Sequence, residues 1–83
     1  MTRAEIEAAI QEELHRIAPE IDFGDIDRSE DLRDECDIDS MDFLNLVTAL
    51  GQRFATPMPE ADYPEMRSFD ALTTYLLGKV DQS

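Results

Sequence analysis

The stretch Asp37-Ile38-Asp39-Ser40-Met41-Asp42-Phe43-Leu44-Asn45-Leu46-Val47 decides the organisation of the chain, because an irregular acidic segment gives way here to an amphipathic helix. Asp39 is a good N-cap, which puts Ser40 at the first helical position. Met41 and Leu44 fall in a row on the side of Ser40, so we expect them to stay exposed beside the serine. At about 100° per residue, the buried stripe of this helix consists of Phe43, Leu46, Val47, Leu50 and Phe54.

Upstream of this stretch, the sequence predicts a first helix over about residues 3–17. Thr2 is placed to cap it, with Glu5 reaching back as in a capping box. Pro19 ends it, because the residue before a proline is pushed out of the α region. The apolar residues that recur at helical spacing on one face are Ile6, Ala9, Ile10, Leu14 and Ile17.

The connection over about residues 18–39 is long for so small a domain, and such loops are usually functional or disordered. We expect this one to be ordered, with one helical turn after Ser29. Apolar residues punctuate its acids at irregular intervals and would fix it over the helices: Ile21, Phe23, Ile26, Leu32 and Ile38.

Downstream, the two prolines at 57 and 59 mark a second connection. A short helix is predicted over about residues 60–66, interrupted at Pro64, and Ser68 caps a final helix over about residues 69–79. No stretch alternates with period two. The sequence therefore predicts one all-α domain over residues 1–83, with three main helices, a short third helix and a long loop between the first two.

Composition excludes several classes of function. Twenty acids against seven bases give a net charge of −13, which repels nucleic acid and favours partners with basic docking faces. A single cysteine excludes an intramolecular disulfide. No window holds 18 apolar residues, and the N-terminus is unlike a signal peptide, so we expect a cytoplasmic protein without membrane insertion.

The residues give no support for catalysis or a metal site. A hydrolytic triad would need His15, which falls on the flank of a helix and is better explained as a surface residue. Acids surround Cys36 and would raise the pKa of its thiol, so a small buried thiol is the simpler interpretation. Asp37 and Asp39 open like an EF-hand loop, but Asp42 and Thr48 stand at positions 6 and 12, where that loop needs glycine and glutamate.

Ser40 remains as a candidate modification site. It follows a long loop, and a phosphodiester on it would lie near free backbone N–H groups and the positive end of a helix dipole. On spacing alone, a serine that merely helps to cap the helix is the simpler interpretation.

The residues from Leu32 to Met41 resemble the segment leading into the Asp-Ser-Leu motif of acyl carrier proteins, where the serine carries 4′-phosphopantetheine. The resemblance continues over Asp42–Leu50 and Phe54, and on to Tyr75-Leu76. It implies a four-helix bundle that a phosphopantetheinyl transferase modifies at Ser40. An acyl group would then be held as a thioester and offered to acyl-activating, acyl-transferring or condensing enzymes.

In some members of this family the cargo folds back between the helices. The residues that would line such an acyl pocket here are Phe43, Leu46, Tyr63, Met66 and Leu72, each of which is also explained as ordinary core.

The chain departs from the family pattern in three ways. Met41 replaces the usual leucine, which makes the motif similar to that of D-alanine carrier proteins. Cys36-Asp37 stands where many members have Leu-Gly. After Asp42 the helix has no acid, although Asn45, Gly51, Gln52 and Arg53 occupy positions that are commonly glutamate in fatty-acid carriers.

We therefore expect a specialised monomeric carrier that partners recognise through Asp39, Met41, Asp42 and Leu44. Its pathway would be fatty-acid, polyketide or other specialised biosynthesis. Two alternatives stay open: an aminoacyl carrier of the D-alanine type, and a small acidic helical adaptor that binds a basic protein without a prosthetic group.

Overall fold

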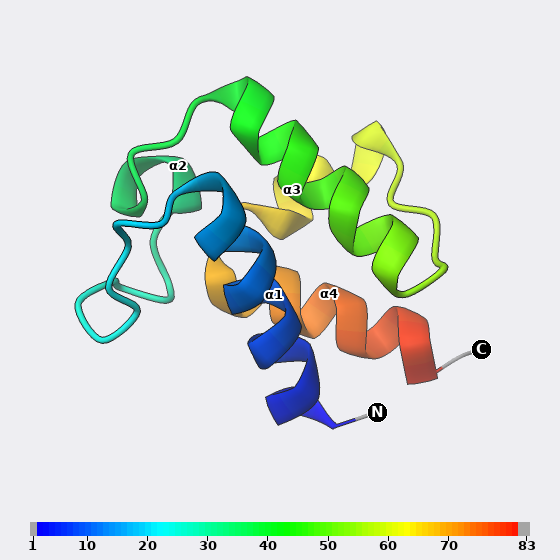
Figure 1. Cartoon of the computed structure of the whole chain (residues 1–83). Helices are drawn as coiled ribbons and strands as arrows, with labels where there is room; N and C mark the ends of the chain where they lie inside the picture. The colour runs from blue at the N-terminus through cyan, green and yellow to red at the C-terminus, as the bar shows by residue number, and fades with distance from the viewer. Residues whose placement is uncertain (1, 82–83) are drawn as a thin grey trace.

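Five helical segments follow one another in the computed structural model, which describes residues 2–81 (Figure 1). These residues contain no β-strand beyond an isolated bridge between Asp31 and Ser68. The all-α prediction is confirmed, and the expected turn after Ser29 is present as a one-turn helix. The segments are α1 (Arg3–Ile17), α2 (Leu32–Glu35), α3 (Ser40–Arg53), the 3₁₀-helix η1 (Glu60–Met66) and α4 (Phe69–Asp81).

Each of the three main helices begins at a side chain that bonds a free N–H group of the first turn. The Thr2 hydroxyl accepts from the Glu5 amide at 3.2 Å and also donates to the Glu5 carboxylate at 3.2 Å, so Glu5 meets the hydroxyl of its cap rather than the cap's backbone. The Asp39 carboxylate caps α3 by accepting a hydrogen bond from the Asp42 amide at 2.8 Å. Ser68 caps α4 at 3.0 Å.

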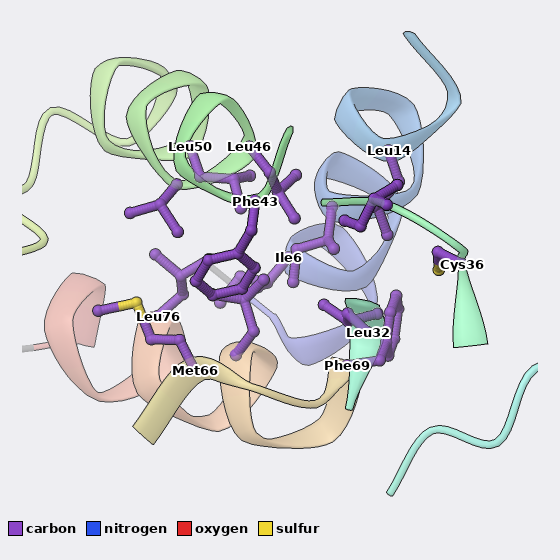
Figure 2. Packing of buried hydrophobic residues seen from close by; sticks show 14 residues of the cluster. Ile6, Leu14, Leu32, Cys36, Phe43, Leu46, Leu50, Met66, Phe69 and Leu76 are labelled. Atoms are coloured by element: carbon purple, nitrogen blue, oxygen red, sulfur yellow. The ribbon is translucent and has the colours of Figure 1, made fainter. Parts of the chain in front are cut away.

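The hydrophobic core lies where α1 packs against both α3 and α4, and η1 packs against α4. Phe43, Leu46 and Leu50 point from α3 into this space (Figure 2). The predicted stripe of α3 is buried except at Phe54, which is only partly buried. The other large side chains that are fully buried include Ile6, Ile10, Leu14, Leu32, Met66, Phe69, Leu72 and Leu76.

The long connection is held against the beginning of α4. The Leu32 amide donates to the Arg67 carbonyl at 2.7 Å, and the Asp70 amide donates to the Arg28 carbonyl at 3.0 Å. The Arg28 guanidinium lies 5.1 Å from the ring centroid of Phe69. The loop is therefore ordered by backbone bonds as well as by its apolar side chains.

The η1 segment differs from the prediction of an interruption at Pro64. The helix runs through this proline, because the fixed φ of proline suits a 3₁₀ turn and only one N–H donor is lost. The Tyr75 hydroxyl donates to the Asp62 carboxylate at 2.7 Å and holds η1 against α4.

Candidate functional site

Ser40 is exposed at the first residue of α3, and its hydroxyl makes no hydrogen bond within residues 2–81. Asp39, not Ser40, caps the helix. The other two serines of this part of the chain are engaged. Ser29 donates to Asp27 at 2.6 Å, and Ser68 caps α4. Ser40 is thus the serine in the described region whose hydroxyl is free to react.

A groove of about 380 Å³ opens beside Ser40. Its apolar part includes Phe43 and Tyr63, whose rings meet edge to face with centroids 5.9 Å apart and planes at 85°. The groove therefore joins the possible attachment point to an aromatic surface between α3 and η1. Its full lining is Arg33, Ser40, Phe43, Leu44, Glu60, Tyr63, Pro64 and Arg67.

The five side chains predicted to line an acyl pocket divide into two groups. Phe43 and Tyr63 line the groove. Leu46, Met66 and Leu72 are 0% exposed and lie in the core instead. Since core packing leaves no free space around such residues, a chain entering from the groove would reach them only if α3 and η1 separated.

The four residues predicted to meet partners lie together at the start of α3. Met41 is 72% exposed and Leu44 is 45% exposed, as expected from the helical projection. Asp39 is exposed and Asp42 is half-buried. An exposed apolar pair flanked by two carboxylates suits contact with a partner that is apolar and basic.

Arg53 is engaged within the molecule, although its position in the sequence suggested a place on the docking helix. Its guanidinium lies 2.7 Å from the Glu12 carboxylate and 3.3 Å from that of Glu13, so it ties α3 to α1. The hydrogen bond to Glu12 raises the pKa of Arg53. The exposed part of α3 that remains is uncharged, at Asn45, Thr48 and Gln52.

Other reactive groups are poorly placed. His15 is exposed on α1 and has no hydrogen bond to Ser40 in the described structure. Cys36 is buried, and this burial raises the pKa of its thiol, with a smaller contribution from the charge of Glu35. The raised pKa leaves less of the reactive thiolate, so Cys36 is a weak nucleophile. Residues 2–81 contain no cluster of metal-ligating side chains. Within the same residues, no helix has the length and apolarity that crossing a membrane requires.

The turn before α3 has a left-handed residue. Asp37 has φ 52°, a conformation that glycine adopts most easily. Cys36-Asp37 therefore makes a turn of the kind that Leu-Gly would allow in acyl carrier proteins. Here the left-handed position is occupied by Asp37, which has a side chain, instead of by glycine.

Sequence reasoning missed Arg33 and Arg67 as groove residues. The two are far apart in the chain and meet at the groove only because the Leu32 amide bonds the Arg67 carbonyl. Neither charge pattern nor helical period signals such a contact.

Comparison with solved structures identifies the fold. The chain is similar to a candidate acyl carrier protein from Anaplasma phagocytophilum, known from its solution structure, with a TM-score of 0.79 and 21% sequence identity. The match covers 94% of this chain and 91% of that one. The fold is thus the helical bundle of acyl carrier proteins.

Comparison with family models identifies the class. The model described as "Phosphopantetheine attachment site" matches residues 4–76. The chain belongs to this family of phosphopantetheine-carrying domains, and it is a carrier of the acyl carrier protein type, not an enzyme. The predicted cofactor is confirmed, which excludes the adaptor without a prosthetic group. No curated protein sequence matches the chain significantly.

Proposed function

We propose that Ser40 is the attachment point of 4′-phosphopantetheine and that the protein carries an acyl group as a thioester on the thiol of this arm. The observation that carries the proposal is the free, exposed hydroxyl of Ser40 at the start of α3, beside the groove. Because Asp39 performs the capping, the fold has no structural need for the serine hydroxyl.

Attachment is a phosphoryl-group transfer catalysed by a phosphopantetheinyl transferase. The Ser40 oxygen forms a bond to phosphorus of coenzyme A and loses its proton, and adenosine bisphosphate leaves. The phosphodiester then lies at the first turn of α3, where free N–H groups and the helix dipole favour negative charge.

Short cargo would lie against the apolar wall that Phe43, Leu44 and Tyr63 form in the groove. A longer chain would pass between Phe43 and Tyr63 toward Leu46, Met66 and Leu72. This second path breaks packing contacts in the hydrophobic core. It therefore suits a cargo with enough apolar surface to replace the contacts that are lost.

The partners would be acyl-activating, acyl-transferring or condensing enzymes of fatty-acid, polyketide or other specialised biosynthesis. Asp39, Met41, Asp42 and Leu44 would form their contact surface. Since the exposed residues of α3 beyond Asp42 include no acid, and Arg53 is the one charged residue among them, a basic partner that binds a row of glutamates would bind this carrier weakly. Binding to fatty-acid synthase enzymes as tight as that of a housekeeping carrier, at matched salt, would contradict this specialised role.

A second candidate function is an aminoacyl carrier, which the motif Asp39-Ser40-Met41 favours. The two candidates differ in the acid that the cognate ligase activates. Incubation of the loaded protein with ligases for fatty acids and for D-alanine, followed by intact-mass measurement, separates them.

Intact mass also tests the attachment site. With coenzyme A, Mg²⁺ and a broad-range transferase, the wild type should gain the mass of one phosphopantetheine group. Ser40→Ala should gain nothing. Ser29→Ala is the matched control, because it removes a hydroxyl elsewhere and should be loaded fully. Loading of Ser40→Ala would refute the assignment.

A further inference from the structure

Arg67 differs from the other arginines of the described structure, because no carboxylate there lies within ion-pair distance of it, although its charge still acts on the Asp31 carboxylate from farther away. The chain has twenty acids and seven bases, so a guanidinium outside any close ion pair is unexpected. Lys79 also forms no ion pair in this region, but its Nζ lies 5.3 Å from the ring centroid of Tyr75. The five arginines that do form ion pairs are Arg3, Arg16, Arg28, Arg33 and Arg53.

Arg67 is one of the residues that line the groove beside Ser40. The backbone bond from Leu32 to Arg67 sets α2 beside the beginning of α4, which brings Arg33 to the same groove. Arg33 uses Nε and one terminal nitrogen for Asp31, at 3.3 and 3.2 Å, so its other terminal nitrogen remains available. Two arginines thus line the groove next to the exposed serine.

We propose that Arg67, assisted by Arg33, binds the phosphodiester of the arm attached to Ser40. The inference rests on the proposed function, because it needs the arm at this serine. A phosphodiester is anionic at every physiological pH, and attachment to Ser40 would fix it beside a groove that Glu60 also lines, at the helix start that carries Asp39 and Asp42. Arginine binds phosphate oxygens through paired N–H donors, and here it offsets the repulsion from these three carboxylates.

Binding of the phosphodiester gives the arm a direction. Its first atoms lie along the groove, over Phe43 and Tyr63, instead of sampling all directions in solvent. The arm would then leave the protein from the η1 side of Ser40, away from the exposed Met41.

Phosphorus NMR of the loaded protein tests the inference. Arg67→Gln removes the charge and keeps most of the length, and Arg16→Gln is the control with the same change in net charge on exposed α1 surface. We expect the phosphodiester resonance of Arg67→Gln to shift toward that of the free diester, and Arg16→Gln to keep the wild-type resonance. High salt should shift the wild type in the same direction, and Arg67→Lys should shift less than Arg67→Gln.

The outcomes separate the two proposals. Mass spectrometry first confirms loading, and circular dichroism confirms the fold. A wild type that gains no mass refutes the proposed function and this inference together. A loaded protein whose resonance is the same with and without Arg67 refutes the inference alone.

A second experiment asks whether the anion that Arg67 binds belongs to the cargo instead of the phosphodiester. Proteins loaded with butyryl and succinyl groups differ by one distal carboxylate. If the phosphorus resonance depends on Arg67 in both forms, the phosphodiester is the ligand of Arg67. Dependence only in the succinyl form would overturn the proposal and make the cargo carboxylate the ligand.

Discussion

Leu44 and Leu46 are separated by one residue on α3 and have opposite surroundings. Leu46 is 0% exposed and points from α3 into the hydrophobic core (Figure 2). Leu44 is 45% exposed and lines the groove beside Ser40. The same helix therefore carries one leucine that stabilises the core and another that is exposed beside the serine.

The difference shows that apolar character alone does not locate a site on this molecule. Burial makes Leu46 part of the scaffold, whereas exposure next to a free serine makes Leu44 a candidate for contact with cargo or partner. Substitutions at four positions test this division, in order of their expected effect on the free energy of unfolding.

Leu46→Ala should cause the largest loss. Removing three carbon atoms from a fully buried position leaves a cavity, which costs roughly 2–5 kcal/mol. Denaturant unfolding followed by circular dichroism measures it. A loss below about 1 kcal/mol would mean that the inner face of α3 packs loosely.

Asp37→Ala and Asp37→Gly test the turn that leads into α3. Both remove the carboxylate, but only glycine adopts φ 52° without strain, so the alanine variant should be less stable by about 1 kcal/mol. Equal unfolding midpoints in urea would show that the turn relaxes to another conformation.

Tyr75→Phe tests how η1, the far wall of the groove, is held. Loss of the bond to Asp62 should cost about 0.5–1.5 kcal/mol near neutral pH. Partial burial, followed by that bond and the charges of Asp62 and Glu65, raises the pKa of Tyr75 from 10.0 to about 12.

The raised pKa adds a dependence on pH. Between pH 10 and 12 the unfolded chain loses the tyrosine proton while the folded chain keeps it, so wild-type stability falls as the pH rises through this window. Phenylalanine does not titrate, and Tyr75→Phe should lose less stability over the same range. Parallel curves for the two proteins would contradict the assigned pKa.

Leu44→Ala should change stability least, by less than about 0.5 kcal/mol, because the side chain is largely exposed. Its effect should appear in kinetics instead. If Leu44 anchors the transferase, kcat/KM for loading should fall about five-fold, the equivalent of ~1 kcal/mol. Thr48→Ala, on the same exposed side of α3, is the control and should load normally.

Local signals explain what the sequence could predict. Thr2, Asp39 and Ser68 each start a helix through a bond to a residue three positions later, so the signal lies within one turn. The exposure of Met41 and Leu44 follows from the angle between successive residues of a helix. Ser40 stands out for the same local reasons.

Features that depend on packing between distant segments could not be predicted. Helical period places Leu46 and Phe43 on one face, but only the position of η1 decides that Phe43 borders the groove and Leu46 does not. The same holds for Arg53, whose ion pairs are with α1, and for Arg67. Pro64 does not interrupt η1, contrary to the prediction, because the effect of proline differs between an α-helix and a 3₁₀-helix.

The hydrogen bond from the Leu32 amide to the Arg67 carbonyl also has a kinetic consequence. Leu32 is 1% exposed, so its amide exchanges with deuterium only when the segment after η1 moves away from α2. A cargo that entered the core between α3 and η1 would push η1 aside, and the segment that holds the Leu32 amide follows η1 directly. The exchange rate of one backbone amide therefore reports how often the bundle opens, and we expect that rate to rise with the length of the attached acyl chain.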